Sequence, residues 1–147
     1  MAVTGKLYSY FFNALANKEI DLVGTPDSIY VMLTTSTYTP DQDVHDYYND
    51  VTNEVSGTGY SANGAALASI TWTYTSGTNT WAFDAADTSW TTATITARNA
   101  IVYDRTPGTD ATRPLICYQA SDADITSTAG TWTITWNASG IFTIVVS

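Results

Sequence analysis

The chain has 147 residues, a single cysteine and a net charge of −9, from five basic and fourteen acidic side chains. This length predicts one domain over 1–147, and five Trp, ten Tyr and four Phe can supply its core. The acidic balance excludes the basic footprint that nucleic acid or an anionic membrane surface attracts, and one cysteine excludes an internal disulfide. No stretch has the pattern of a secretory signal or a membrane span, so we expect synthesis in a reducing cytoplasm.

Apolar residues spaced i, i+1, i+4, i+5 and i+8 predict a helix over about 6–17. The residues of this face are Leu7, Tyr8, Phe11, Phe12 and Leu15. A strand follows over 28–33, where β-branched and aromatic residues are frequent. A second helix is predicted over about 40–53, because Thr39 and Gln42 have capping-box spacing around a proline at the first helical position.

From Tyr60 onward the sequence is typical of strands separated by short turns. In the run 131–136 threonine alternates with Trp132, Ile134 and Trp136, which places the three apolar side chains on one strand face. The predicted strands are 65–75, 80–84, 93–104, 114–119, 131–136 and 141–146, with a tight hairpin over 136–141. The predicted fold is mainly β, an antiparallel β-sandwich or jelly-roll-like barrel with one or two N-terminal helices.

Residues for catalysis or metal binding are few. His45 is the only histidine, and the aspartates around it in 41–50 favour its protonated form, so we expect an exposed, ion-paired side chain and no catalytic residue. Cys117 lies in an apolar strand-like run and is expected to act as a small core residue. The acidic segment 41–50 lacks an EF-hand loop, which leaves calcium open there, and we predict no metal or other cofactor.

Two groups of apolar side chains are candidates for contact with a partner. The face of the helix 6–17 can dock on another protein or, equally, cover the open face of the sandwich. Trp81, Phe83 and Trp90 flank a turn-like segment and are candidates for an exposed aromatic patch, with a place in the core as the alternative.

Several sequence blocks occur in the order found in a family of small structural proteins of tailed bacteriophages. The blocks are 7–22, 38–43, 54–60, 83–87, 94–98, 101–103, 114–116 and 133–142. They are distributed along most of the chain, from residue 7 to residue 142, and they are specific as a set rather than singly. The chain therefore resembles these capsid decoration (cement) or minor structural proteins, although a glycine common in the family is missing from 121–124.

The resemblance implies a non-enzymatic virion protein that binds the outer capsid and stabilises capsomer contacts. Its partners would be the major capsid protein and other copies of itself, with a trimer as one arrangement. It would lie on the capsid surface after assembly in the host cytoplasm. One alternative is a tail or fibre-associated protein that contacts host surface glycans through exposed aromatic residues. A third is a phage glycan hydrolase, which requires two converging carboxylates.

Overall fold

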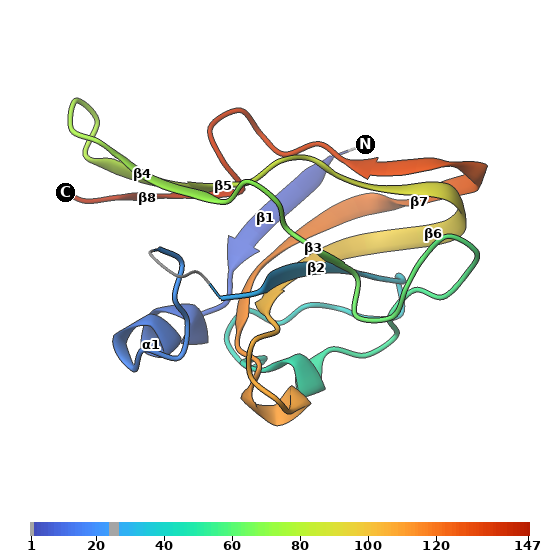
Figure 1. Cartoon of the computed structure of the whole chain (residues 1–147), viewed down its shortest axis with the longest axis horizontal. Coiled ribbons are helices and arrows are strands. Elements are labelled where there is room, and N and C mark those ends of the chain that lie inside the picture. Colours follow the sequence, from blue (N-terminus) through green and yellow to red (C-terminus); the bar gives the residue numbers. More distant parts are fainter. Residues whose placement is uncertain (1, 24–26) are drawn as a thin grey trace.

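The computed structural model describes residues 2–23 and 27–147, and it confirms a mainly β fold of two antiparallel sheets packed together (Figure 1). The five-stranded sheet has the order β1 (Val3–Leu7), β7 (Leu115–Ile134), β6 (Thr88–Asp104), β2 (Ile29–Thr34), β3 (Ala65–Ala66). The three-stranded sheet has the order β4 (Thr71–Thr75), β5 (Thr80–Asp84), β8 (Phe142–Val145). The described helices are α1 (Tyr10–Ala16) and the short 3-10 helices η1 (Tyr48–Asp50) and η2 (Asp110–Thr112).

Strands β6 and β7 pair along nearly their whole length and form the frame of the molecule. Their register slips between Trp90 and Ala93, where Thr92 has a φ of 53° and Ala129 on the opposite strand a φ of 49°. Bulges of this kind bend a strand pair and increase its twist. Figure 1 shows both strands turning back over the sheet, so one hairpin contributes to both layers.

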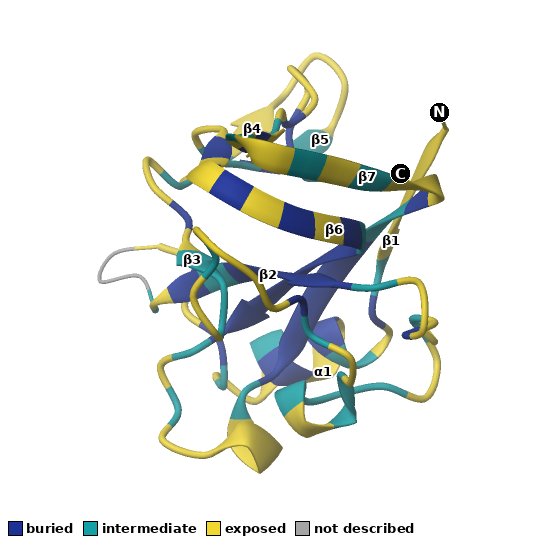
Figure 2. Cartoon of the chain, turned by 90° about the vertical axis from the view of Figure 1, so that its right-hand side faces the viewer, coloured by how far each residue is buried: buried dark blue, intermediate teal, exposed yellow. Residues whose placement is uncertain are grey.

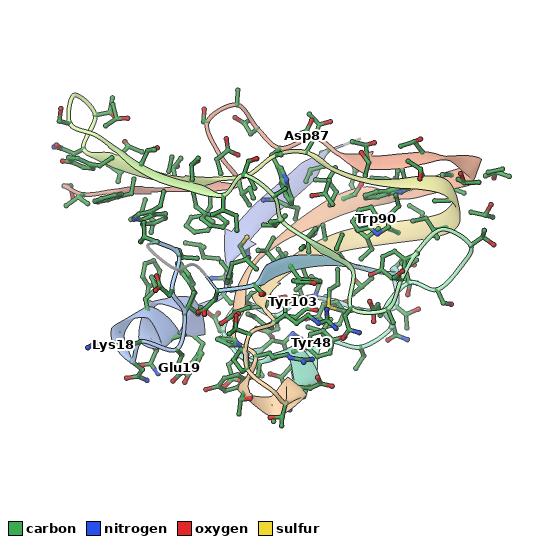
Figure 3. The ribbon with its side chains drawn as sticks, in the orientation of Figure 1. Lys18, Glu19, Tyr48, Asp87, Trp90 and Tyr103 are labelled. Carbon is green, nitrogen blue, oxygen red and sulfur yellow. The ribbon has the colours of Figure 1, made fainter. Side chains whose placement is uncertain are left out.

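The main core lies between the layers. Burial alternates along the first half of β6, with Trp90, Ala93 and Ile95 turned inward and hydroxyl side chains between them (Figure 2). Trp132 meets Trp90 edge to face, with ring centroids 5.7 Å apart. Figure 3 shows Trp90 inside the bend of the hairpin. Trp132 and Trp136 are both buried, which confirms the prediction from the alternation with threonine.

A second buried cluster lies on the other face of the five-stranded sheet. It contains Tyr8, Met32, Tyr38, Ile101, Tyr103, Leu115 and Tyr118. Tyr48, from the connection between β2 and β3, packs on this cluster with its ring centroid 4.8 Å from that of Tyr103 (Figure 3). The middle of the sheet is therefore covered on both faces, which explains why β2 has no alternation of buried and exposed residues.

The helix predicted over 40–53 is wrong, because the segment is a series of turns that ends in η1. Its backbone bonds to residues far away in the sequence. The Tyr48 N–H donates to the Arg113 carbonyl at 2.9 Å, and the Leu115 N–H donates to the Asp46 carbonyl at 2.9 Å. These bonds stabilise the turns more than the capping pattern stabilises a helix. The segment is also rich in Asp, Asn, Tyr and Val, which have low helix propensity.

The helix predicted over 6–17 is too long at its start. Residues 3–7 form β1 because they pair with β7, and α1 begins only at Tyr10. The tight hairpin over 136–141 is also wrong, since β8 pairs with β5 in the other sheet.

The remaining strand predictions agree with the structure for four strands, and the others differ in how their residues are divided into strands. The strands predicted over 28–33, 80–84 and 141–146 are confirmed to within one residue at each end, and the strand predicted over 93–104 is confirmed but begins earlier, at Thr88. The strand predicted over 65–75 is divided into β3 and β4, and Ser69 between them has a φ of 53°. The two predicted strands 114–119 and 131–136 belong mostly to the single strand β7.

Candidate functional site

The three-stranded sheet projects beyond the rest of the molecule and overhangs α1 (Figure 1). In β4 and β5, Tyr74 lies opposite Trp81 and Trp72 opposite Phe83, so their side chains share one face of this sheet. The same face continues into β8 with Ile144, which pairs with Trp81. Alternation therefore gives the projecting sheet one aromatic face and one face rich in threonine.

The aromatic face is buried at its inner end and open at its outer end. Phe83 is fully buried, whereas Tyr74 is 46% exposed and Trp72 and Trp81 are partly buried. Trp72 stacks on Trp81 with ring centroids 5.3 Å apart, and the Tyr74 ring lies 5.1 Å from Trp81. We call the group Trp72, Tyr74, Trp81 and Ile144 the aromatic flap.

The predicted exposed patch of Trp81, Phe83 and Trp90 is therefore wrong for two of its members. Phe83 and Trp90 are core residues, with exposures of 0% and 6%. Trp81 belongs to the aromatic flap together with Trp72 and Tyr74, which lie in the strand predicted over 65–75. In 71–75 threonine alternates with Trp72 and Tyr74, which places both rings on one strand face, but this pattern cannot show that the strand extends past the core.

The residues proposed for docking on the N-terminal helix lie mainly in the interior. Tyr8 and Phe11 are fully buried, and Leu7 and Leu15 pack partly buried against the main core. Phe12 is 50% exposed. This helix therefore closes the sandwich, where Phe11 meets the Phe142 ring at 5.4 Å.

A cavity of about 810 Å³ lies between the layers beside β1. Its walls include Leu7, Cys117, Trp132, Trp136 and Phe142. The size is in the range of small-molecule pockets. Gln119 also lines the cavity, and its Nε2 donates to the Ile141 carbonyl at 3.2 Å, which ties β7 to the segment before β8.

Cys117 lines this cavity but has no activated thiol. The side chain is buried, and burial raises the pKa of the thiol above its usual range. A thiol that stays protonated is a weak nucleophile. Cys117 therefore acts as the small core residue that its apolar sequence context indicates.

His45 is half-buried on the loop before η1. Its ring stacks on Tyr38 with centroids 5.5 Å apart, and its Nδ1 lies 2.9 Å from the Tyr38 hydroxyl. The Asp41 N–H donates to the same nitrogen at 3.2 Å. Across residues 2–23 and 27–147 no ion pair of His45 is found, so the prediction of an exposed, ion-paired histidine is wrong.

Two neighbouring carboxyls of the acidic segment contact each other directly. Burial and a hydrogen bond to Asp50 raise the pKa of Asp46. Burial acts in the same direction on Asp50, but the N–H groups of Asp46 and Tyr47 donate to its carboxylate at 3.0 and 3.2 Å and lower its pKa overall. Carboxyls in mutual contact leave no room for a sugar, whereas glycosidases hold theirs apart across the substrate.

The two glutamates serve as acceptors for tyrosine hydroxyls. Glu19 accepts from Tyr10 and Tyr47 at 3.2 Å each. Glu54 accepts from Tyr60 at 2.8 Å. Within the described part of the chain, no group of three or more His, Cys, Asp or Glu side chains is arranged to hold a metal ion. No helix in that part is both long and apolar enough to cross a membrane.

No family model, no curated protein and no solved structure matches this chain.

Proposed function

We propose that the protein is a non-enzymatic structural component of a tailed-bacteriophage virion, a decoration (cement) protein that binds the outer capsid and stabilises contacts between capsomers. Its partners are the major capsid protein and other copies of itself, and its location is the capsid surface after assembly in the host cytoplasm. The ordered sequence blocks support the class of protein. The aromatic flap is the observation that carries the docking role, because it joins three aromatic rings on a projecting sheet.

The side chains of the flap suit a protein interface. Trp and Tyr are enriched among residues whose truncation costs about 2 kcal/mol or more of binding energy. Tyr74 is the most exposed of the flap's aromatic rings, and its hydroxyl donates to Asn79 at 3.0 Å, which holds the ring in place before binding. A ring that is already ordered loses less conformational entropy when a partner covers it.

Stabilisation of the shell then follows from mass action. A protein that binds the assembled capsid and not the separate subunits shifts the equilibrium toward assembly. The acidic chain, with its net charge of −9, stays soluble before it docks.

The test is binding to capsids of the same phage from which the protein has been removed. We expect the wild-type protein to rebind and to raise the temperature at which the capsids open. Tyr74→Ala and Trp81→Ala should each weaken binding by about 30-fold, which corresponds to about 2 kcal/mol. Thr73→Ala is the matched control, because it changes an exposed residue of the same strand that points to the opposite face.

Two results would contradict the proposal. One is a cryo-EM map of the virion in which the protein occupies the tail and not the shell. The other is wild-type capsid affinity in both flap variants, provided that circular dichroism shows that they are folded.

A tail or fibre-associated protein that binds host surface glycans is the second candidate. The same flap favours it, because partly exposed aromatic rings such as Tyr74 and Trp81 can stack on sugars. Binding of the purified protein to a glycan array, abolished by Trp81→Ala and retained by Thr73→Ala, would support this candidate over the capsid role.

A further inference from the structure

Strand β1 ends the five-stranded sheet with a free edge. Within residues 2–23 and 27–147 it pairs with β7 on one side, and Figure 2 shows no strand of this part of the chain beyond it on the other. The strand is exposed over residues 3–6, and Val3 is 56% exposed. An open edge of this kind is a template for another strand.

The register with β7 shows which backbone groups face outward. The Tyr8 N–H donates to the Ile116 carbonyl at 3.1 Å, and the Asp122 N–H donates to the Ala2 carbonyl at 3.0 Å. Even-numbered residues of β1 therefore bond to β7, because bonding alternates along an antiparallel strand. The N–H and C=O groups of Val3, Gly5 and Leu7 point to the free edge.

The order of residues along this edge is self-complementary. When two copies of β1 run antiparallel about an axis at Gly5, Val3 lies opposite Leu7 of the other copy and Thr4 opposite its Lys6. Each outward-facing pair exchanges two hydrogen bonds, so the three pairs form six. The apolar residues meet each other, and no like charges are opposed.

Neighbouring registers are worse for identifiable reasons. An axis at Lys6 places the two lysines opposite each other, which is destabilising, and it leaves Val3 outside the outward-facing pairs. An axis at Thr4 places Val3 against glycine, so the two apolar residues of the edge no longer meet. A Cβ at Gly5 would meet the end of the flexible Gln119 side chain, which would have to shift.

We infer that β1 is a self-association edge, at which two copies of the chain pair antiparallel about a two-fold axis at Gly5 and join their five-stranded sheets into one. The occupant of the edge is a second copy because the strand complements itself in register, charge and hydrogen bonding. This pairing is independent of the capsid role, since it requires only the edge of β1.

Cross-linking reads the register directly. Thr4 and Lys6 of the two copies would form narrow pairs with Cα atoms about 4.5 Å apart, within the range that a disulfide spans. A mixture of the single variants Thr4→Cys and Lys6→Cys should form a mixed disulfide under mild oxidation, and neither variant alone should cross-link. Cross-linking of either variant alone at the level of the mixture would overturn the register.

Sedimentation equilibrium tests the association without a cross-link. We expect the wild-type chain to reach twice the mass of one copy, and Val3→Pro to raise the dissociation constant at least about tenfold by removing an outward N–H. Thr4→Ala, the control, should associate like wild type and show that side-chain changes on β1 are tolerated. A wild-type monomer at the highest soluble concentration, a trimer, or a Val3→Pro variant that is folded and fully dimeric would each refute the inference.

Discussion

The buried carboxyl of Asp104 should make the protein less stable as the pH rises toward about 6. This residue has no exposed surface at the end of β6. Its Oδ1 accepts from the Thr106 N–H at 2.8 Å, but its Oδ2 has no donor among the described residues. Burial, with a smaller contribution from the nearby Asp27 carboxylate, raises its pKa from 3.8 to about 6 against the lowering effect of the Thr106 hydrogen bonds.

The direction of the pH effect follows from where the proton binds more tightly. A carboxyl with a higher pKa in the folded protein holds its proton better there than in the unfolded chain, so protonation stabilises the fold. This stabilisation is complete below a pH of about 3.8 and is lost as the pH rises through about 6. A shift of this size corresponds to about 3 kcal/mol of unfolding free energy.

Asp104→Asn removes the titration and keeps the shape of the side chain. Its amide can donate to Asp27, and its oxygen can still accept from Thr106. We expect the variant to exceed wild type by up to about 3 kcal/mol at neutral pH and to lose that advantage in acid, measured by urea unfolding over a pH series. Asp122→Asn, at an exposed position, is the control and should follow wild type. Parallel curves for wild type and Asp104→Asn between about pH 4 and pH 7 would refute the reasoning.

Two further predictions concern the packing of the core and the hydrogen bonds of a buried asparagine. Phe11→Ala should lower the unfolding free energy by about 3–5 kcal/mol and Phe12→Ala by no more than about 0.5 kcal/mol, since Phe11 is fully buried and Phe12 is half exposed. Chemical denaturation measures both, and equal losses would contradict the placement of this helix. Asn99→Ala should cost about 2–4 kcal/mol in the same assay, because the Asn99 amide donates at 3.0 Å to both Thr34 Oγ1 and the Tyr38 carbonyl. Asn99→Asp, which cannot donate, should be at least as destabilising, and a near-neutral Asn99→Ala would show that these bonds contribute little.

Local sequence patterns predicted the strands in which buried side chains follow a regular order along the chain. Alternation with threonine identified the inward side chains of β7 up to Trp132, and the apolar content of 28–33 identified β2. The bend of the long hairpin had no such signal. It requires positive φ at Thr92 and Ala129, which are residue types that rarely adopt this conformation.

Contacts between distant residues explain the other differences. β1 has no clear alternation and contains a glycine, and it is a strand because β7 offers it an edge. The exposure of the candidate site likewise depends on contacts between distant residues. Trp81 was recognised as a candidate, but its neighbours Trp72 and Tyr74 are partly open only because β4 and β5 extend past the core, a property of the assembled sheets.

The pairing of β1 with β7 also determines the order in which the chain can fold during its synthesis. Val3 pairs with Ser121, so the partner of β1 is translated on the order of ten seconds later at typical rates. Strands β6 and β7 are joined by the ten residues 105–114 and can pair as soon as both have left the ribosome, since closing a loop of this length costs less entropy than closing the much longer one between β1 and β7. β1 therefore joins the sheet late. Until then both of its edges are unpaired in the nascent chain and accessible to chaperones.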